Sequence, residues 1–379
     1  MAEILATKYR PKSLDDVVGH SVVTTSLKNA FKENNMHQAY IFSGLMGTGK
    51  TSLGRILAAM ENCEKGRTLT PCGVCKNCRE IFAGRSLEVK EINAASSRGI
   101  DNIRELAQEV KSSPLYVNKK FIILDECHSL TNEASEAALK LIEEPPPHLR
   151  IILCTTSPES ILDTIKSRCI SYHLGKISKN DMLEYLPNLL KKEGYDNFDE
   201  NVIKLCIQHS EGSMRYVLQK IQSVIDYCGK NDITFDNAQE VLGTLDSKEI
   251  FGFFENIFKI EFYNSIECIN NMFASGKDVK SVLNSISKHL RSLLLMITCK
   301  NHLKTLGMTD YMVKRFENHI SIMISGNGEV KINEKHKINY VIKMMDLLQD
   351  VYKGVDLGID PIMLLEKFST EAVILRKTI

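Results

Sequence analysis

Residues 44–51 place the strongest constraint on how this chain can fold. They read Gly-Leu-Met-Gly-Thr-Gly-Lys-Thr, follow the apolar run 39–42 and precede the helix-forming run 52–59. A strand, a glycine loop and a helix in this order form a P-loop, in which successive backbone N–H groups surround a phosphate at a helix N-terminus. Lys50 would contact the β- and γ-phosphates, and the Thr51 hydroxyl would bind Mg²⁺. The predicted nucleotide-binding residues are Gly44, Leu45, Met46, Gly47, Thr48, Gly49, Lys50, Thr51 and Ser52.

A second apolar run ends in two carboxylates. Residues 120–124 read as a buried parallel strand, and Asp125 and Glu126 follow at its C-terminal end. Such a pair alone is more typical of a solvated turn, but downstream of a P-loop it fits nucleotide hydrolysis. Asp125 would then hold Mg²⁺, and Glu126 would polarise the attacking water. Together the two motifs predict an ATPase core that takes ATP and Mg²⁺.

Four of the eleven cysteines are clustered, with the spacing C-x8-C-x2-C-x2-C. Four thiolates at such short separations suit tetrahedral Zn²⁺. The alternatives are a redox Cys-x-x-Cys pair and a loop that holds no metal. A closed structural site is favoured over a catalytic one, because four thiolates leave no open position for water. The predicted zinc ligands are Cys63, Cys72, Cys75 and Cys78.

Three further polar residues are candidates with an open alternative. Thr155 follows the apolar run 151–154, where it would either sense a γ-phosphate or form an ordinary turn. Arg168, between a serine and a cysteine, is by spacing alone a surface charge or a finger aimed at a neighbour's phosphate. Arg215 lies in the first turn of a predicted helix, where a cation opposes the helix dipole. Such a position indicates a role elsewhere, and from a helical lid Arg215 could reach the γ-phosphate.

Composition excludes several classes of protein. No run of about 18 apolar residues occurs, so no membrane span is predicted. The N-terminus lacks the basic and apolar regions of a secretory signal, so the protein is predicted to be cytoplasmic, and its cysteines are not expected to form a disulfide framework. The formal net charge is +1, so any nucleic-acid contact must come from a local basic surface.

The pattern along the 379 residues predicts three domains. Residues 1–176 alternate strands with helices, which predicts a parallel sheet covered by helices on both faces, with a cysteine module at about 61–80. Residues 177–242 read as a small helical lid, and residues 243–379 as an all-helical bundle. Polar residues dominate 326–337, where a loop between helices is expected.

These motifs together resemble the clamp-loader branch of the AAA+ ATPases, and within it the gamma/tau subunits of bacterial DNA polymerase III. The resemblance runs to about residue 246 and weakens beyond it. It is carried by residues 9–12 and 16–19 (an adenine-binding opening segment), 37–44 (the run into the P-loop), 71–80 (a zinc module), 141–146 (a helix end), 167–169 (the signature of a trans arginine finger) and 243–246 (the start of a third domain).

The resemblance implies an ATPase subunit that uses ATP binding and hydrolysis to open a sliding clamp and load it on primer-template DNA. Arg10 and Val18 would contact the adenine, and Arg168 would act in trans on a neighbour's nucleotide. The helical bundle would be an oligomerising collar. The implied partners are delta-like and delta-prime-like subunits, further copies of this chain, the clamp, and DNA bound without sequence preference at the replication fork, with no membrane. The residues implied to act in cis are Lys50, Thr51, Asp125, Glu126, Thr155 and Arg215.

Some residues depart from the family pattern. Asn93 and Ser157 stand where Asp is usual, and Tyr216 follows Arg215 where Asp is usual. These changes affect local hydrogen bonding, and none removes a catalytic group. The chain ends at Ile379, without the long extension of the tau form, so it resembles the short gamma-like form or a diverged or virus-encoded relative.

Two rival functions are open from the sequence. A branch-migration helicase or another AAA+ remodeller has the same fold, but the cysteine module and residues 167–169 argue against it. A non-catalytic scaffold of the delta-prime type is disfavoured by the intact Lys50 and Glu126. On the DNA side, Arg98 and Arg104 are weak candidates, because two basic residues on a polar loop and helix start are usually solvated.

Overall fold

The computed structural model of the chain describes residues 3–96, 99–195, 198–229, 233–242, 247–299, 310–325 and 334–377. The chain divides into two compact units, Met1–Ala238 and Gln239–Ile379. Each unit has its own hydrophobic core. The division into domains 1–176, 177–242 and 243–379 stays a prediction, and the motif 243–246 lies outside the described residues.

The first unit is built on a five-stranded parallel sheet with the order β2-β3-β4-β1-β5. All strands run the same way, so their carboxyl ends share one edge. At this edge the register pairs Ser43 with Thr155 and Asn93 with Asp125, which brings the ends of both sequence motifs together. The strands are β1 (Ala39–Gly44), β2 (Val89–Asn93), β3 (Lys120–Asp125), β4 (Leu149–Thr155) and β5 (Ile170–Leu174).

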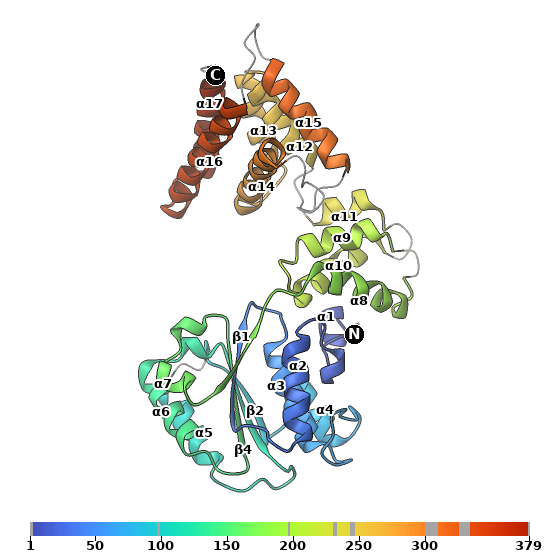
Figure 1. Cartoon of the computed structure of the whole chain (residues 1–379), viewed down its shortest axis with the longest axis vertical. Coiled ribbons are helices and arrows are strands. Elements are labelled where there is room, and N and C mark those ends of the chain that lie inside the picture. The colour runs from blue at the N-terminus through green and yellow to red at the C-terminus, as the bar shows by residue number, and fades with distance from the viewer. Residues whose placement is uncertain are drawn as a thin grey trace. The chain divides into compact units, whose positions relative to one another are not determined.

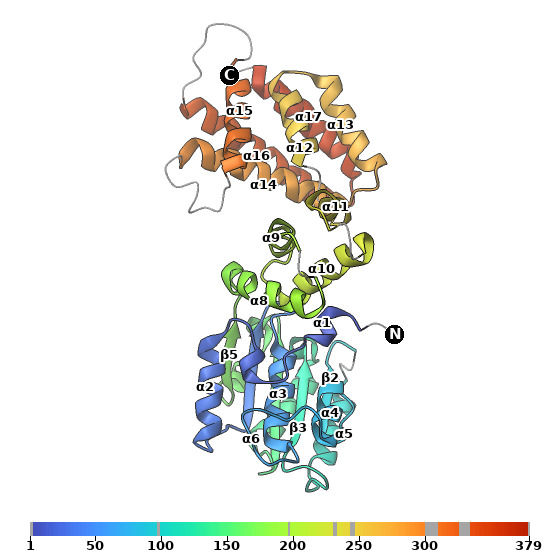
Figure 2. The ribbon, with the colours of Figure 1, turned by 90° about the vertical axis from the view of Figure 1, so that its right-hand side faces the viewer.

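Helices cover both faces of the sheet, as predicted (Figures 1 and 2). Alternate residues of β1 enter opposite cores, because successive side chains of a strand point to opposite faces. Tyr40 and Phe42 pack with α2 and α3, whereas Ile41 packs with α5 and α6. The helices of this layer are α1 (Leu5–Lys8), α2 (Ser21–Lys32), α3 (Lys50–Asn62), α4 (Lys76–Ala83), α5 (Ile100–Glu109), α6 (Asn132–Glu143) and α7 (Asp163–Lys166).

Four more helices follow β5: α8 (Lys179–Lys192), α9 (Glu200–Gln208), α10 (Met214–Cys228) and α11 (Phe235–Val241). The N-terminal segment joins this group to the sheet layer. The backbone N–H of Leu5 donates to Gln222 Oε1 on α10 at 3.2 Å, and Lys8 Nζ pairs with the Glu193 carboxylate at 2.6 Å. Helices α8 and α10, which belong to the lid expected after residue 176, are therefore tied to the N-terminal segment within the first unit.

The described part of the second unit is all-helical, as predicted, with an apolar core rich in phenylalanine. The prediction of a loop over 326–337 is wrong for its last residues, because a helix begins at Glu334. An acidic side chain at this position favours a helix N-terminus. Residues 326–333 lie outside the described part of the chain. Among the described helices, none has both the length and the apolar character needed to cross a bilayer. The helices are α12 (Ser247–Phe258), α13 (Phe262–Ala274), α14 (Val279–Thr298), α15 (Asp310–Ser325), α16 (Glu334–Asp356) and α17 (Pro361–Lys377).

Candidate active site

The predicted P-loop connects β1 to the first residue of α3, Lys50. Gly44 has φ 143°, and a Cβ there would lie 2.1 Å from the carbonyl oxygen of Leu174 on β5, so only glycine fits beside that strand. Lys50 Nζ donates to the carbonyl oxygens of Gly44 at 2.9 Å and Leu45 at 3.0 Å. Burial lowers the pKa of Lys50, and the nearby Glu126 carboxylate opposes that effect. The ammonium group is thus held against the loop that would receive a phosphate.

The two predicted magnesium ligands lie next to each other. Thr51 Oγ1, in the first turn of α3, donates to Asp125 Oδ2 at 2.9 Å, although 74 residues separate them in the chain. A hydroxyl and a carboxylate are oxygen ligands of the kind that Mg²⁺ prefers. This pair therefore fits the magnesium site that the sequence predicts.

Glu126 is held by residues at the end of the neighbouring strand β4. It has φ 49°, a left-handed backbone conformation that is uncommon for a residue other than glycine. Its Oε2 accepts from Thr156 Oγ1 at 3.0 Å and lies 3.4 Å from His128 Nδ1. His128 Nδ1 is also 3.1 Å from Thr155 Oγ1, which accepts from the backbone N–H of Ser157 at 3.0 Å.

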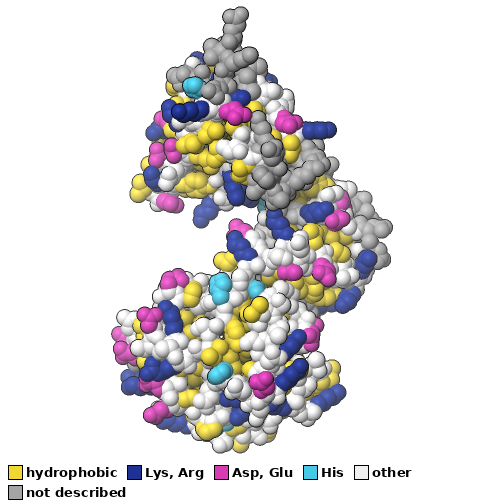
Figure 3. Space-filling model, viewed as in Figure 1, with side chains coloured by type: hydrophobic (Ala, Val, Ile, Leu, Met, Phe, Trp, Pro, Cys, Tyr) yellow, Lys and Arg dark blue, Asp and Glu magenta, His cyan; other side chains and the backbone are white. Residues whose placement is uncertain are grey.

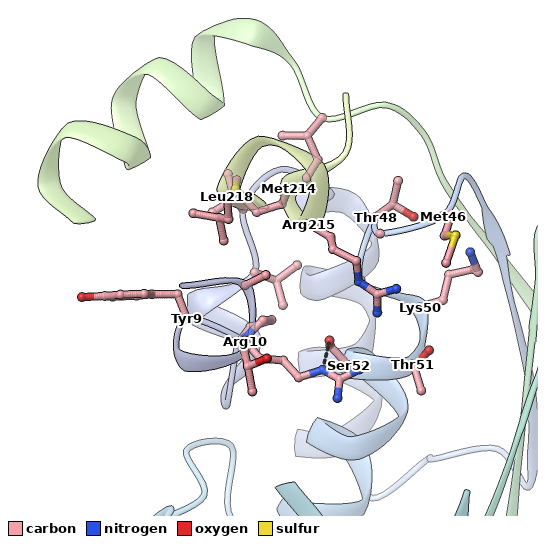
Figure 4. A pocket seen from close by; sticks show the side chains of 18 of the residues that line it. Tyr9, Arg10, Met46, Thr48, Lys50, Thr51, Ser52, Met214, Arg215 and Leu218 are labelled. Atoms are coloured by element: carbon pink, nitrogen blue, oxygen red, sulfur yellow. Dashed lines mark hydrogen bonds between the residues drawn. The ribbon is translucent and has the colours of Figure 1, made fainter. Parts of the chain in front are cut away.

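Helix α10 places Arg215 over the P-loop. Ser213 caps this helix by accepting from the N–H of Tyr216 at 3.3 Å, and the Arg215 N–H points at the Gly47 carbonyl oxygen at 3.5 Å. The Tyr216 hydroxyl donates to Met46 Sδ at 3.4 Å, so the residue that replaces the usual aspartate contacts the loop. Figure 4 shows the Arg215 side chain reaching from α10 toward the loop that carries Thr48 and Lys50.

These parts enclose a cavity of about 460 Å³. The N-terminal segment contributes Arg10, whose Nε donates to Ser52 Oγ at 3.1 Å (Figure 4). Burial lowers the pKa of this guanidinium. Cations and carboxylates therefore meet at one concave surface, a setting that suits a metal-bound polyphosphate. Its lining includes the predicted Arg10, Val18, Met46, Gly47, Thr48, Gly49, Lys50, Thr51, Ser52, Asp125, Glu126 and Arg215.

Other predicted site residues do not line this cavity. Gly44 and Leu45 contribute carbonyl oxygens to Lys50 behind it. Thr155 is fully buried against His128, one layer from the cavity wall. Arg168 lies elsewhere on the surface, where its guanidinium pairs with Glu143 Oε1 at 2.9 Å and donates to the Thr164 carbonyl oxygen at 2.9 Å.

Sequence reasoning missed several residues of the site. Thr156 and His128 contact Glu126, and the position of Thr156 at the tip of a strand could have indicated this. Met214 and Leu218 of α10 add an apolar wall, which the sequence shows only as helical periodicity. Asn93 lines the cavity too, and its Oδ1 accepts from the N–H of Ala95 at 2.8 Å.

The four clustered cysteines converge at the far end of α3. Their Sγ atoms all lie within 4.8 Å of one another, and Zn–S bonds of about 2.3 Å place tetrahedral sulfurs about 3.8 Å apart. Cys72 Sγ accepts from the N–H of Cys75 at 3.3 Å, and backbone N–H groups of Val74 and Cys75 lower the pKa of the Cys72 thiol to about 6. A thiolate is the form that binds the metal, so this donor set fits Zn²⁺.

The DNA candidates gain no support from geometry. Arg104 pairs weakly with Asp101 at 3.9 Å and its side chain is 63% exposed, while Arg98 lies outside the described residues. On the face of the first unit seen in Figure 3, basic and acidic side chains are interspersed rather than gathered by sign. DNA contact by either arginine stays a prediction.

Comparison with known proteins identifies the family of this chain. A family model described as "DNA polymerase III, delta subunit" matches residues 19–178. The gamma subunit of DNA polymerase III from Buchnera aphidicola subsp. Schizaphis graminum is 32% identical over 336 residues, which cover 89% of this chain and 91% of that protein. The tau subunit from Escherichia coli strain K12 is 36% identical over 281 residues, which cover 74% of this chain and 43% of that protein. Among solved structures, the RuvB Holliday junction branch migration motor of Thermotoga maritima is 17% identical, covers 66% of this chain and 80% of its own, and gives a TM-score of 0.48. With nine tenths of the Buchnera gamma subunit covered at this identity, the chain belongs to the DNA polymerase III gamma/tau subunit family.

Proposed function

We propose that the chain is the ATPase subunit of a DNA clamp loader, which binds and hydrolyses ATP to open a sliding clamp and load it on primer-template DNA. One observation carries the hydrolysis step. Lys50, Thr51, Asp125, Glu126 and Arg215 come from three separate segments and meet at a single cavity. A glycine-rich turn that binds no ligand would not require these side chains to lie at one cavity.

Each group has a distinct role in this proposal. Lys50 and Arg215 neutralise charge on the phosphates, Arg10 and Val18 border the nucleoside, and Thr155 senses the γ-phosphate through the layer behind Glu126. Glu126 takes a proton from the attacking water. Phosphoryl transfer depends mainly on positioning and charge stabilisation, which is what such a constellation supplies.

Two metal ions complete the proposal. Thr51 and Asp125 would hold Mg²⁺, which would neutralise charge that develops on the phosphates. Cys63, Cys72, Cys75 and Cys78 would hold a structural Zn²⁺ that joins the end of α3 to the start of α4.

Family membership supports the proposed partners. The relatives are named as gamma and tau subunits of DNA polymerase III. We therefore infer that this chain assembles with further copies of itself and with delta-like and delta-prime-like subunits, with the second unit as the collar, and acts at the replication fork. Arg168 would reach the nucleotide of a neighbouring subunit.

The test is ATP turnover by the purified chain, assembled with its partner subunits, with and without sliding clamp and primed DNA. We expect turnover that rises when both are present, and none from Lys50→Ala. ATP binding without turnover under all conditions would identify a scaffold subunit. Turnover that responds to branched DNA and ignores the clamp would identify a branch-migration motor.

A further inference from the structure

We propose that Thr156 and His128 are positioning residues for hydrolysis, which hold Glu126 so that one oxygen of its carboxylate faces the water. This inference rests on the proposed ATPase function. Thr156 follows β4, and His128 lies two residues after Glu126 in a short 3-10 helix (Cys127–Ser129). Both side chains direct a polar atom at the same carboxylate oxygen, Oε2, at 3.0 Å and 3.4 Å.

The two oxygens of Glu126 have different surroundings. Oε2 faces Thr156 and His128, whereas Oε1 accepts no hydrogen bond from the part of the chain that the structure describes. Glu126 also lines the cavity. An anchored carboxylate with one open oxygen loses little freedom when it bonds to water, and positioning of this kind is a large part of catalysis.

The backbone supports the same geometry. At φ 49° the chain turns sharply after β3, and the Glu126 N–H donates to Asp125 Oδ1 at 3.1 Å. Asp125 can therefore face Thr51 while Glu126 faces the end of β4. Adjacent carboxylates on one extended strand would point to opposite faces of the sheet, so this turn is what lets both serve one cavity.

His128 lies between Glu126 and Thr155, and its tautomer determines how it can bond to them. A carboxylate oxygen only accepts, so a hydrogen bond from His128 to Glu126 requires the proton on Nδ1. The same N–H lies 3.1 Å from Thr155 Oγ1, which already accepts from the N–H of Ser157. In this tautomer the single Nδ1–H lies between the Glu126 carboxylate and the Thr155 hydroxyl, so His128 links the proposed base to the residue behind it.

The reaction step balances within this arrangement. The water oxygen attacks the γ-phosphorus, the bond from that phosphorus to the ADP oxygen breaks, and the water proton passes to Glu126 Oε1. The products are ADP and inorganic phosphate. Thr156 and His128 exchange no atom with substrate, and they act only through Glu126 and Thr155.

Thr156 is tested with two variants that differ by one hydroxyl. Thr156→Val keeps the shape and removes the donor, and we expect kcat to fall by about tenfold or more, as for loss of a hydrogen bond to a charged group. KM for ATP, ATP affinity and the melting temperature should stay unchanged. Thr156→Ser restores the hydroxyl and should restore most of kcat.

The role of His128 is tested with two replacements, His128→Asn and His128→Gln, that place an amide nitrogen at different positions of the ring. In Asn the amide nitrogen overlies the position of Nδ1, whereas in Gln it overlies Nε2. His128→Asn should therefore retain most of kcat, and His128→Gln should lose about as much as Thr156→Val. In a Glu126→Gln background, Thr156→Val should cause little further loss, because it acts through that carboxylate.

Each outcome bears on one claim. If the unaltered protein hydrolyses ATP and Thr156→Val matches it, or if Thr156→Ser fails as badly as Thr156→Val, the positioning role is refuted while the ATPase proposal stands. A loss of ATP affinity or of melting temperature in Thr156→Val equal to its loss of turnover would likewise overturn it. Absence of hydrolysis in the unaltered, assembled protein would refute the proposed function itself and this inference with it.

Discussion

Gly47 meets the lid helix at a distance that no side chain allows. It has φ 78°, and a Cβ there would lie 2.3 Å from Ser213 Oγ and 2.8 Å from Arg215 Cβ. The glycine is therefore required for two reasons: the loop must curve around a phosphate, and α10 must come close enough for Arg215 to reach the cavity. A residue of the P-loop thus also limits how closely α10 can approach.

Gly47→Ala should push α10 away from the loop and strain the backbone. We expect ATP affinity to fall by about tenfold or more, consistent with left-handed strain in a residue other than glycine. Gly66→Ala is the matched control, because Gly66 also has a positive φ of 96° but has open space around it. Binding of a fluorescent ATP analogue would measure both, and equal affinities in the two variants would contradict the contact.

Glu126→Gln preserves the shape of the side chain but removes the charge that we propose polarises water. We expect ATP binding to remain and turnover to fall by roughly 100-fold or more, in line with the weight of such groups in catalysis. Glu144→Gln, an exposed residue after α6, should leave turnover unchanged. Steady-state hydrolysis and equilibrium binding separate the two effects. Near-normal turnover in Glu126→Gln would assign the base to another residue.

At the scale of single elements, α3 joins the two chemical sites. It begins at Lys50 in the P-loop and ends at Asn62, next to Cys63. Thirteen residues of helix span about 20 Å. The four clustered cysteines therefore lie too far away to touch a nucleotide at the other end of the helix, and a metal held by them would act on the structure of the first unit.

Cys75→Ser should remove the zinc and lower the melting temperature, because a closed four-thiolate site contributes directly to folding free energy. ATP affinity measured well below the melting temperature should stay near that of the unaltered chain. Metal analysis should give about one Zn per chain before the substitution and none after it. Cys299→Ser, outside the cluster, serves as the control. A metal-free protein that melts at the same temperature would rule out the structural role.

In the second unit, α12, α14 and α15 bury two histidines among aromatic rings. His289 stacks on Phe254 with ring centroids 4.3 Å apart, and His319 meets Phe251 edge-on at 4.5 Å. Burial lowers the pKa of His319 to about 4 and that of His289 well below its usual value; Arg315 lowers both further, and Glu255 opposes the shift of His319. Neutral imidazoles are thus part of this apolar core.

The sign of the resulting pH dependence follows from these shifts. In the unfolded chain both histidines are protonated below about pH 6.5, whereas in the folded chain they stay neutral to lower pH. Their contribution to the free energy of unfolding should therefore be complete above about pH 6.5 and be lost as the pH falls toward 4. Thermal unfolding at pH 7.5 and pH 5.0 should show a drop that His319→Phe reduces. His336→Phe, at an exposed position on α16, should leave the drop unchanged. An identical drop in all three proteins would show that His319 does not contribute.

At the scale of the whole molecule, local patterns carried the predictions that the structure confirmed. The strand before the P-loop, the strand before Asp125 and the helix that begins at Lys50 follow from short runs of residues. The strand order and the bond from Thr156 to Glu126 depend on contacts between distant segments, which no short run encodes. The start of α16 at Glu334 was missed because its first turn is polar and resembles a loop.

Arg168 tests whether the chain works as a ring or alone. Its guanidinium is held by Glu143 and Thr164 on its own surface, and it does not line its own cavity. The predicted role as an arginine finger therefore requires the nucleotide of a neighbouring subunit. Loss of an arginine finger supplied in trans costs on the order of a thousandfold in turnover. Arg168→Ala should bind ATP normally yet hydrolyse it poorly, whereas Lys50→Ala should not bind ATP.

Mixing the two inactive variants distinguishes a finger from a structural arginine. An Arg168→Ala subunit still has an intact cavity, and a Lys50→Ala subunit still offers its arginine, so some interfaces in a mixed assembly pair a working cavity with a working finger. Turnover should partly return on mixing, in proportion to those interfaces. A structural arginine would give no such rescue, because its loss would damage the subunit that carries it. If the variants co-assemble, as mass measurement of the intact complex can show, and turnover stays at the sum of the separate proteins, then Arg168 does not act in trans.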